Sequence, residues 1–423
     1  MTALATVVRE PRAIERRLVA AAAFAVLGLV NIFVFGRFAH AGDATFGLSL
    51  PGAAVSVPNL HVAAAPTCYA LGAATLVLAA LRAVADLRRW MRQVVLTAVL
   101  VFFVISLLCW ADAGNFLPLN LINLFQVTLV TSIPIILGAM AGCMCERSGV
   151  INIAIEGQLL FGAFASAVVA SAFGGLWLGL VTGSLAGGLI GALLAVFAIR
   201  YLVDQIILGV VLSVFALGLT NFLYDRVLIP YQNRLNSPAT FGNVKIPGLG
   251  DIPIIGPVFF DSTVFLYITY AVVIGVQVVL FSTRWGLRVR AVGEHPQAAD
   301  TVGIRVLGIR YTQVILGGLI AGIGGAAFTI GSVGSFGEDM SSGLGYIALA
   351  ALIFGRWRPL GAMGAALLFG FATSLQQILS TLNTPLPSNV LLMAPYVATI
   401  IAVASRGGGI RPPKADGQPY IKA

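Results

Sequence analysis

Charged side chains are scarce in this sequence. Asp, Glu, Lys and Arg together make up 10% of its 423 residues, whereas a soluble domain carries about 25%. Hydrophobic residues make up 59%, and the mean hydropathy is +0.97. In water, a chain this apolar would expose more hydrophobic surface than a soluble protein tolerates. Long apolar runs also recur along it. The composition therefore excludes a soluble protein and predicts an all-α polytopic membrane protein.

Lysine, histidine and cysteine are also rare. None of the three lysines follows a glycine-rich loop, so the phosphate-binding motif of P-loop ATPases is missing. The three histidines are scattered and form no cluster with nucleophiles or metal ligands. Cys143-Met144-Cys145 has no second cysteine pair or neighbouring histidine, which favours small buried side chains over a zinc site. The sequence predicts neither an enzyme nor a metal site.

The apolar runs predict about 10–12 transmembrane or re-entrant helices in two pseudo-repeated halves. The first run follows Arg16-Arg17 and precedes Ala39-His40-Ala41, as in a secretory signal. It is long for such a signal, so we expect an uncleaved first helix. The predicted segments lie near 18–36, 62–81, 93–110, 122–142, 150–172, 176–199, 205–224, 262–283, 311–331, 343–355, 359–380 and 389–405.

The lysines and arginines are distributed unevenly between the predicted loops. If the N-terminus is cytoplasmic, Arg37, Arg226, Arg234 and Lys245 fall outside, and the other 21 of the 25 basic residues fall inside. This asymmetry is what the positive-inside rule predicts. It places both termini in the cytoplasm and explains the basic pI without a nucleic-acid partner.

The segments suggest three regions. Residues 1–120 are predicted to form an N-terminal three-helix membrane extension, residues 121–405 the core, and residues 406–423 a cytoplasmic tail. Within the core, the loop 225–261 is expected outside and the loop 282–310 inside the cell.

The inside loop contains a short predicted helix. Pro296 is suited to a first helical turn, the polar Glu294-His295 precedes it, and Gly303 is a natural stop. A helix this short is marginal in water by itself, so we expect it to dock against another surface. A solvated basic loop is the alternative.

Two polar breaks interrupt the apolar core. In the first, residues 146–158 (ERSGVINIAIEGQ), a helix would place Asn152 and Glu156 on one face, with Gln158 pointing elsewhere. A polar face at membrane depth must meet a cavity or another polar group. Glu146-Arg147 is better explained as an interfacial charge pair.

The second break spans residues 334–343 and precedes a run too short to cross the bilayer. Broken segments in corresponding halves are typical of a transporter's central site. Glu338 and Asp339 in this break are therefore candidates for the substrate path, and an exposed outside turn is an equally favoured alternative.

Three stretches, residues 146–164, 285–304 and 347–372, together resemble the membrane subunits of bacterial nucleoside ABC importers. These belong to a larger permease family that also serves branched-chain amino acids and ribose. The stretches read ERSGVINIAIEGQLLFGAF, WGLRVRAVGEHPQAADTVGI and IALAALIFGRWRPLGAMGAALLFGFA. The resemblance covers the chain from about residue 120 to the tail.

The resemblance implies a multi-pass subunit of the bacterial cell membrane that forms the path for nucleosides. It implies a second, related permease, a cytoplasmic ABC ATPase that binds ATP and Mg, and an extracytoplasmic substrate-binding lipoprotein; no cofactor is expected in this chain. The expected path residues are Asn152, Glu156, Gln158, Phe161, Glu338 and Asp339. The expected ATPase-coupling residues are Arg288, Arg290, Glu294, His295, Pro296, Gln297, Asp300 and Gly303.

Other functions remain open at this point. A ribose-type sugar or branched-chain amino acid permease would share most of these features. An ion-coupled secondary transporter would need no docking helix, and a non-transporting scaffold would not depend on Glu156.

Overall fold

The computed structural model describes residues 9–39, 42–50, 57–115, 118–381, 393 and 411–422, with only the backbone of 9–16 and Arg89. The chain forms two compact units, Met1–Asn123 with Ile378–Pro387, and Leu124–Gln377 with Ser388–Ala423. Within the described residues, 10 helices are long and apolar enough to cross a membrane. The predicted all-α polytopic membrane fold is confirmed. The predicted segment 389–405 lies outside the described residues, except for position 393.

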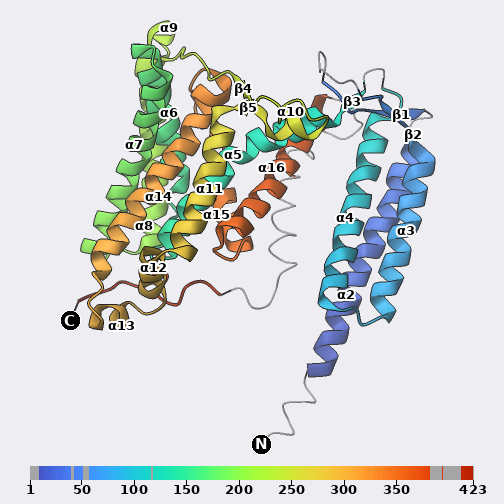
Figure 1. Cartoon of the computed structure of the whole chain (residues 1–423), viewed down its shortest axis with the longest axis horizontal. Helices are drawn as coiled ribbons and strands as arrows, with labels where there is room; N and C mark the ends of the chain where they lie inside the picture. The colour runs from blue at the N-terminus through green and yellow to red at the C-terminus, as the bar shows by residue number, and fades with distance from the viewer. Residues whose placement is uncertain are drawn as a thin grey trace, which may run out of the picture. The chain divides into compact units, whose positions relative to one another are not determined.

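The first unit contains three membrane-length helices and a small sheet (Figure 1). The helices bury Phe24, Ala79 and Val99 between them. In the sheet, β1 pairs antiparallel with β2 and parallel with β3. The elements are α2 (Arg9–Val30) continuing as η1 (Asn31–Gly36), β1 (Asp43–Gly47), β2 (Leu60–Ala63), α3 (Ala64–Val84), α4 (Arg89–Asp112) and β3 (Leu119–Asn120).

The second unit is built mainly of helices. Its first half contains α5 (Leu121–Glu146), α6 (Ile155–Phe173), α7 (Leu176–Ala195) with η2 (Val196–Arg200), α8 (Gln205–Leu223) with η3 (Tyr224–Leu228) and α9 (Gln232–Leu235). Its second half contains β4 (Asn243–Lys245), α10 (Ile255–Phe259), β5 (Asp261–Thr263), α11 (Val264–Ser282), α12 (Arg284–Glu294), α13 (Pro296–Thr301), α14 (Val306–Phe328) with η4 (Thr329–Val333), α15 (Leu344–Phe354) and α16 (Pro359–Thr381).

Glycines allow three of these helices, α6, α7 and α14, to pack closely side by side (Figure 1). A methyl group at Gly322 of α14 would collide with the backbone of Gly183 in α7, and one at Gly325 would collide with the backbone of Leu159 in α6. Small residues are what membrane helices use for such close approach. The glycines at 322–325 therefore serve helix packing.

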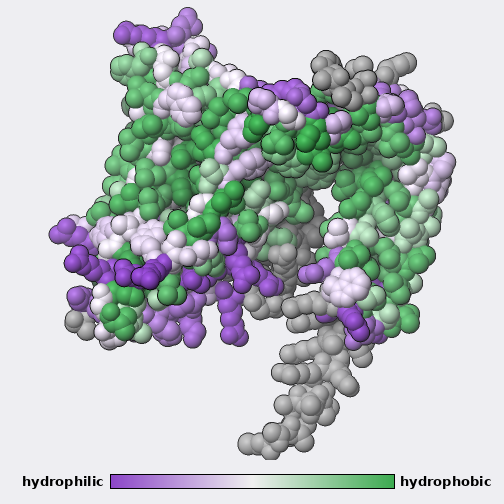
Figure 2. All heavy atoms as spheres, viewed as in Figure 1, coloured by the Kyte–Doolittle hydropathy of each residue, from purple (hydrophilic) through white to green (hydrophobic). Residues whose placement is uncertain are grey.

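The structure corrects two boundaries in the second unit. The first half of the inside loop 282–310 forms α12, an eleven-residue helix that the sequence analysis missed, whereas α13 begins at Pro296 as predicted. Helix α6 begins only at Ile155, so Asn152 lies outside it, in the connection between α5 and α6. Figure 2 shows hydrophilic residues gathered at both ends of this unit's helices, with hydrophobic residues between them, as a membrane-spanning body requires.

Candidate functional site

The first polar break does not present Asn152 and Glu156 on one face. Asn152 Nδ2 donates a hydrogen bond to Gln158 Oε1 over 3.1 Å, and Gln158 Nε2 donates to Asn152 Oδ1 over 3.4 Å. Both side chains are fully buried. The predicted arrangement, in which Gln158 pointed away, was wrong because the helix starts after Asn152. The hydrogen bonds between these two amides stabilise the connection between α5 and α6.

Glu156, in the first turn of α6, binds the start of α15. Its Oε1 accepts from Ser341 Oγ at 2.6 Å and from the Gly343 amide at 2.9 Å, and its Oε2 accepts from the Gly345 amide at 2.6 Å. The first amides of a helix lack partners within the helix and attract negative charge. Glu156 thus caps α15 from a neighbouring helix and is only 8% exposed.

Glu146 and Arg147 are not a plain interfacial charge pair. The Glu146 carboxylate accepts a hydrogen bond from Trp357 Nε1 and is buried. Arg147 Nε donates to the Trp357 carbonyl over 2.8 Å, and burial lowers the pKa of Arg147. The two residues instead hold the turn between α15 and α16, where Arg356 and Trp357 have φ of 60° and 53°.

The remaining predicted path residues lie in two other places. Glu338 and Asp339 are exposed in the break before α15. A hydrogen bond with the Asp225 side chain raises the pKa of Glu338. Phe161 packs on a buried cluster that includes Leu208 and Leu212.

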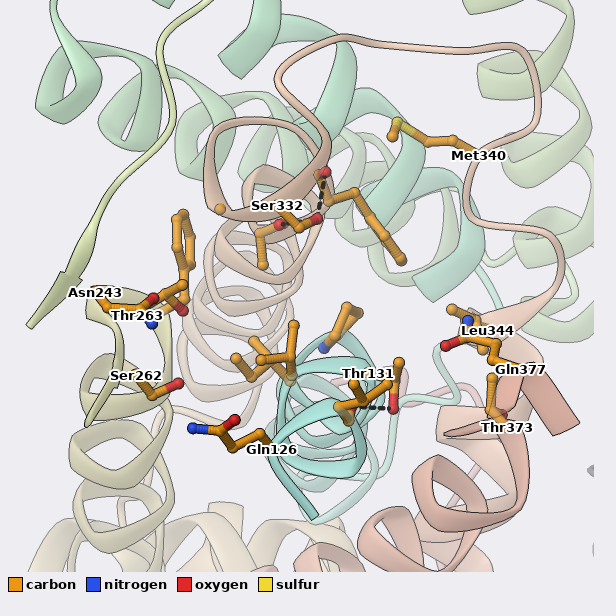
Figure 3. Close-up of a pocket in the computed structure, with 18 of the residues that line it drawn as sticks. Gln126, Thr131, Asn243, Ser262, Thr263, Ser332, Met340, Leu344, Thr373 and Gln377 are labelled. Atoms are coloured by element: carbon orange, nitrogen blue, oxygen red, sulfur yellow. Dashed lines mark hydrogen bonds between the residues drawn. The ribbon is translucent and has the colours of Figure 1, made fainter. Parts of the chain in front are cut away.

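A cavity of about 550 Å³ lies elsewhere in the second unit. Figure 3 shows polar side chains reaching it from α5, from β4 and β5, and from α16. Phe265, Phe328, Met340 and Leu344 add apolar surface. The polar lining residues are Gln126, Thr131, Asn243, Asp261, Ser262, Thr263, Ser332, Thr373 and Gln377.

None of the six predicted path residues lines this cavity. Glu156 nevertheless supports its wall, because Leu344 lies between the two glycines whose amides bind Glu156. The cavity was not predicted from the sequence. One signal was present in Thr373 and Gln377, which are four residues apart and so share a helix face.

The cavity combines hydrogen-bonding groups with aromatic surface. The Thr131 and Thr373 hydroxyls donate to carbonyls of their own helices, at 2.8 and 3.1 Å, and their oxygens retain lone pairs that can accept from a ligand. Gln126 Nε2 donates to the Pro257 carbonyl over 2.9 Å. A cavity of this volume, mostly apolar with a few oriented polar groups, is typical of a small-molecule site.

The expected ATPase-coupling residues lie together at the end of α11 and α14 opposite β4 and β5 (Figure 1). Arg288, Arg290 and Glu294 belong to α12 rather than to an irregular loop. Most of the set is exposed, and Arg290, Pro296 and Asp300 are half-buried. Gly303 follows α13 with φ of 82°, which fits its predicted role as a helix stop. His295, Pro296, Gln297 and Asp300 form the junction and the body of α13.

Asp416, in the C-terminal segment, predicts a pH dependence of stability. Its burial and the neighbouring Glu146 raise its pKa to about 8, although Arg310 acts in the opposite direction. The unfolded value is about 3.9, so the folded state binds more protons between these pH values, and stability falls as the pH rises through this window. We expect a lower unfolding temperature at about pH 9 than at about pH 6, and a weaker pH dependence for Asp416→Asn. Equal pH dependence in both proteins would contradict this.

Comparison with known proteins identifies the family. The model of the branched-chain amino acid transport system / permease component family matches residues 124–403. The guanosine ABC transporter permease protein NupQ of Bacillus subtilis is 43% identical over 307 residues, which cover 70% of this chain and 95% of the relative. The nucleoside ABC transporter permease protein NupC of Lactococcus lactis is 40% identical over 320 residues, covering 72% of this chain and 100% of the relative.

A putative glucose ABC transporter permease protein of Haloferax volcanii, TsgC13, is 32% identical over 286 residues, covering 66% of this chain and 85% of the relative. No solved structure gives a significant match. The matched residues begin where the second unit begins, at residue 124. The chain belongs to the branched-chain amino acid transport system permease family and is a multi-pass membrane permease subunit of an ABC transporter.

Proposed function

We propose that this chain forms the translocation path for nucleosides in an ATP-driven importer, and that the cavity between α5, α11, α14 and α16 is where the nucleoside passes. The similarity to two permeases named for guanosine and nucleosides, over almost their whole length, carries the substrate class. The cavity supplies hydrogen-bonding side chains and apolar surface that a nucleoside could contact.

A nucleoside has a flat base and a ribose with several hydroxyls. Phe328, which is half-buried, offers aromatic surface for the base. The side chains of Gln126, Thr131 and Gln377 can exchange hydrogen bonds with the base edge or the ribose. Binding here should be weak, because a separate binding protein captures the substrate and tight binding in the path would slow its release.

The cavity lies next to the elements expected to face outside. Asn243, Ser262 and Thr263 belong to β4 and β5, at the end of the predicted outside loop. A substrate-binding lipoprotein would deliver nucleoside to this end, and the cytoplasmic ATPase would act on α12 and α13 at the other. Both termini of this chain would lie in the cytoplasm. A second permease would complete the path, and the partner ATPase would hydrolyse ATP.

Cysteine labelling tests the site directly. The four native cysteines, Cys68, Cys109, Cys143 and Cys145, are buried, so background reaction with a maleimide should be low. We expect guanosine at ten times its Kd to slow labelling of the Ser332→Cys variant by about tenfold. Labelling of Val333→Cys, the neighbouring exposed position that does not line the cavity, should not change.

Two other outcomes would contradict the proposal. Protection by glucose alone would favour the sugar-permease function, for which TsgC13 is the similar protein. Protection by leucine alone would favour branched-chain amino acids, the substrates in the family's description.

A further inference from the structure

The C-terminal segment, residues 411–422, packs on the helices expected to receive the ATPase. The Ala415 amide donates to the Gly293 carbonyl over 2.9 Å, at the end of α12. Arg310 Nη1, from the first turns of α14, donates to the Gln418 carbonyl over 2.9 Å. These bonds tie the segment to both helices that flank α13.

Apolar contacts fix the far end of the segment. Tyr420 is 7% exposed and belongs to one buried cluster with Val292, Ala299 and Val306. These three partners come from α12, from α13 and from the start of α14. The segment is therefore a built part of this surface rather than a loose tail.

The same segment packs closely against the first polar break, at residues 149–151. A methyl group at Gly149 would lie 2.9 Å from both the Ala415 carbonyl oxygen and Arg310 Nη2, and Gly149 has φ of 87°. One at Gly417 would lie 2.7 Å from Ile151 Cδ1. Only small residues fit these positions, so the contact between the segment and residues 149–151 is close.

A cavity of about 390 Å³ opens between the segment and α13. Its lining includes His295, Pro296 and Gln297 on one side and Lys414, Pro419 and Ile421 on the other. Ile421 is 72% exposed, although it is a large hydrophobic residue. Ile421 is therefore available for an apolar contact at the rim of this cavity.

The exposed charges on the segment and on residues 284–305 are mostly positive. Arg411, Lys414 and Lys422 are exposed on the segment, and Arg288 and Arg305 are exposed on α12 and immediately before α14, whereas Asp300 and Asp416 are half-buried. Glu294 is the acidic residue in the lining, and its carboxylate accepts from the Lys414 amide over 3.4 Å. A partner that fits this surface should present acidic residues around an apolar contact.

We propose that residues 411–422 and α13 form one composite docking surface, and that an acidic-rimmed segment of the cytoplasmic ATPase occupies the cavity between them. This inference rests on the proposed function. It adds that the C-terminal segment is part of the coupling surface, in addition to α13. Through Arg310 and residues 149–151, the segment also connects this surface to the start of α6 and α14.

Association of the purified importer subunits tests the proposal. Permease in lipid nanodiscs is titrated with the purified ABC ATPase of the same importer, and the Kd is measured. We expect Ile421→Asp to weaken association by at least about tenfold, or about 1.4 kcal/mol. Leu249→Asp, an exposed apolar residue in the outside loop and 44% exposed, is the matched control and should leave the Kd unchanged.

A charge-reversal variant, Lys414→Glu with Lys422→Glu, should weaken association in the same direction, more strongly at low salt than at high salt. The inference is overturned if the wild-type permease binds the ATPase and both segment variants bind it equally well. It is also overturned if the variants lose only binding to vesicles of anionic lipid. Failure of the wild-type permease to bind any ABC ATPase would instead overturn the proposed function.

Discussion

Replacing Glu156 by alanine is expected to remove a large part of the stability of the second unit. The substitution leaves two backbone amides, of Gly343 and Gly345, and the Ser341 hydroxyl without their acceptor. Each buried donor left unpaired costs about 1–3 kcal/mol, against a total stability of about 5–15 kcal/mol for a typical domain. We expect Glu156→Ala to lower the unfolding temperature sharply and to reduce the yield of folded protein.

Glu156→Gln should also destabilise the protein, although less. Each carboxylate oxygen accepts from a backbone amide, Oε1 from Gly343 and Oε2 from Gly345. A glutamine must place its NH₂ group against one of them, whichever way its amide is turned. The site therefore needs a carboxylate. The loss of stability in Glu156→Gln should result from the unmatched NH₂ group at the helix cap.

Thermal unfolding in detergent, with transport measured on the folded fraction, separates the two roles of Glu156. The matched control is Glu338→Gln, an exposed carboxylate in the break before α15, which should unfold like the wild type. If Glu156→Gln unfolded like the wild type but lost transport, Glu156 would bind the substrate and would not act by capping α15.

Filling the cavity with a large side chain is expected to lower nucleoside uptake strongly. Thr373→Trp places an indole in the cavity, and the protein should still fold because the space is open. We expect nucleoside uptake to fall by at least about tenfold, since a loss of 1.4 kcal/mol in binding already gives that factor. Assembly with the ATPase should be unchanged.

The control for this variant is Leu368→Trp on the same helix, at a position that is 41% exposed and does not line the cavity. It adds the same side chain without occupying the cavity. Equal uptake by Thr373→Trp and the wild type would show that the substrate passes elsewhere.

Features that depend on local sequence were predictable. The apolar runs gave the membrane helices because backbone groups in lipid must be satisfied within the segment. Pro296 marked the start of α13. Helix α12 was missed because its many arginines resemble a solvated loop. Only its buried Val289 and Val292, three residues apart, indicated an amphipathic helix.

Features that depend on distant residues were not predictable. Glu156 was predicted as a path residue because a polar side chain at membrane depth needs a partner, but its partners lie 185 to 189 residues further along the chain. The cavity draws its polar lining from four separate regions, and no single segment carries its pattern. Polarity in an apolar helix shows that a partner is needed, and only the tertiary packing shows which partner it is.

Uptake into proteoliposomes tests whether this permease carries nucleosides. The vesicles would contain the complete importer with ATP inside, and radiolabelled guanosine and its binding protein would be added outside. We expect ATP-dependent accumulation of guanosine that unlabelled nucleosides inhibit and that glucose and leucine do not. Accumulation of glucose or leucine without guanosine, or guanosine uptake that needs an ion gradient and no ATPase, would contradict this expectation.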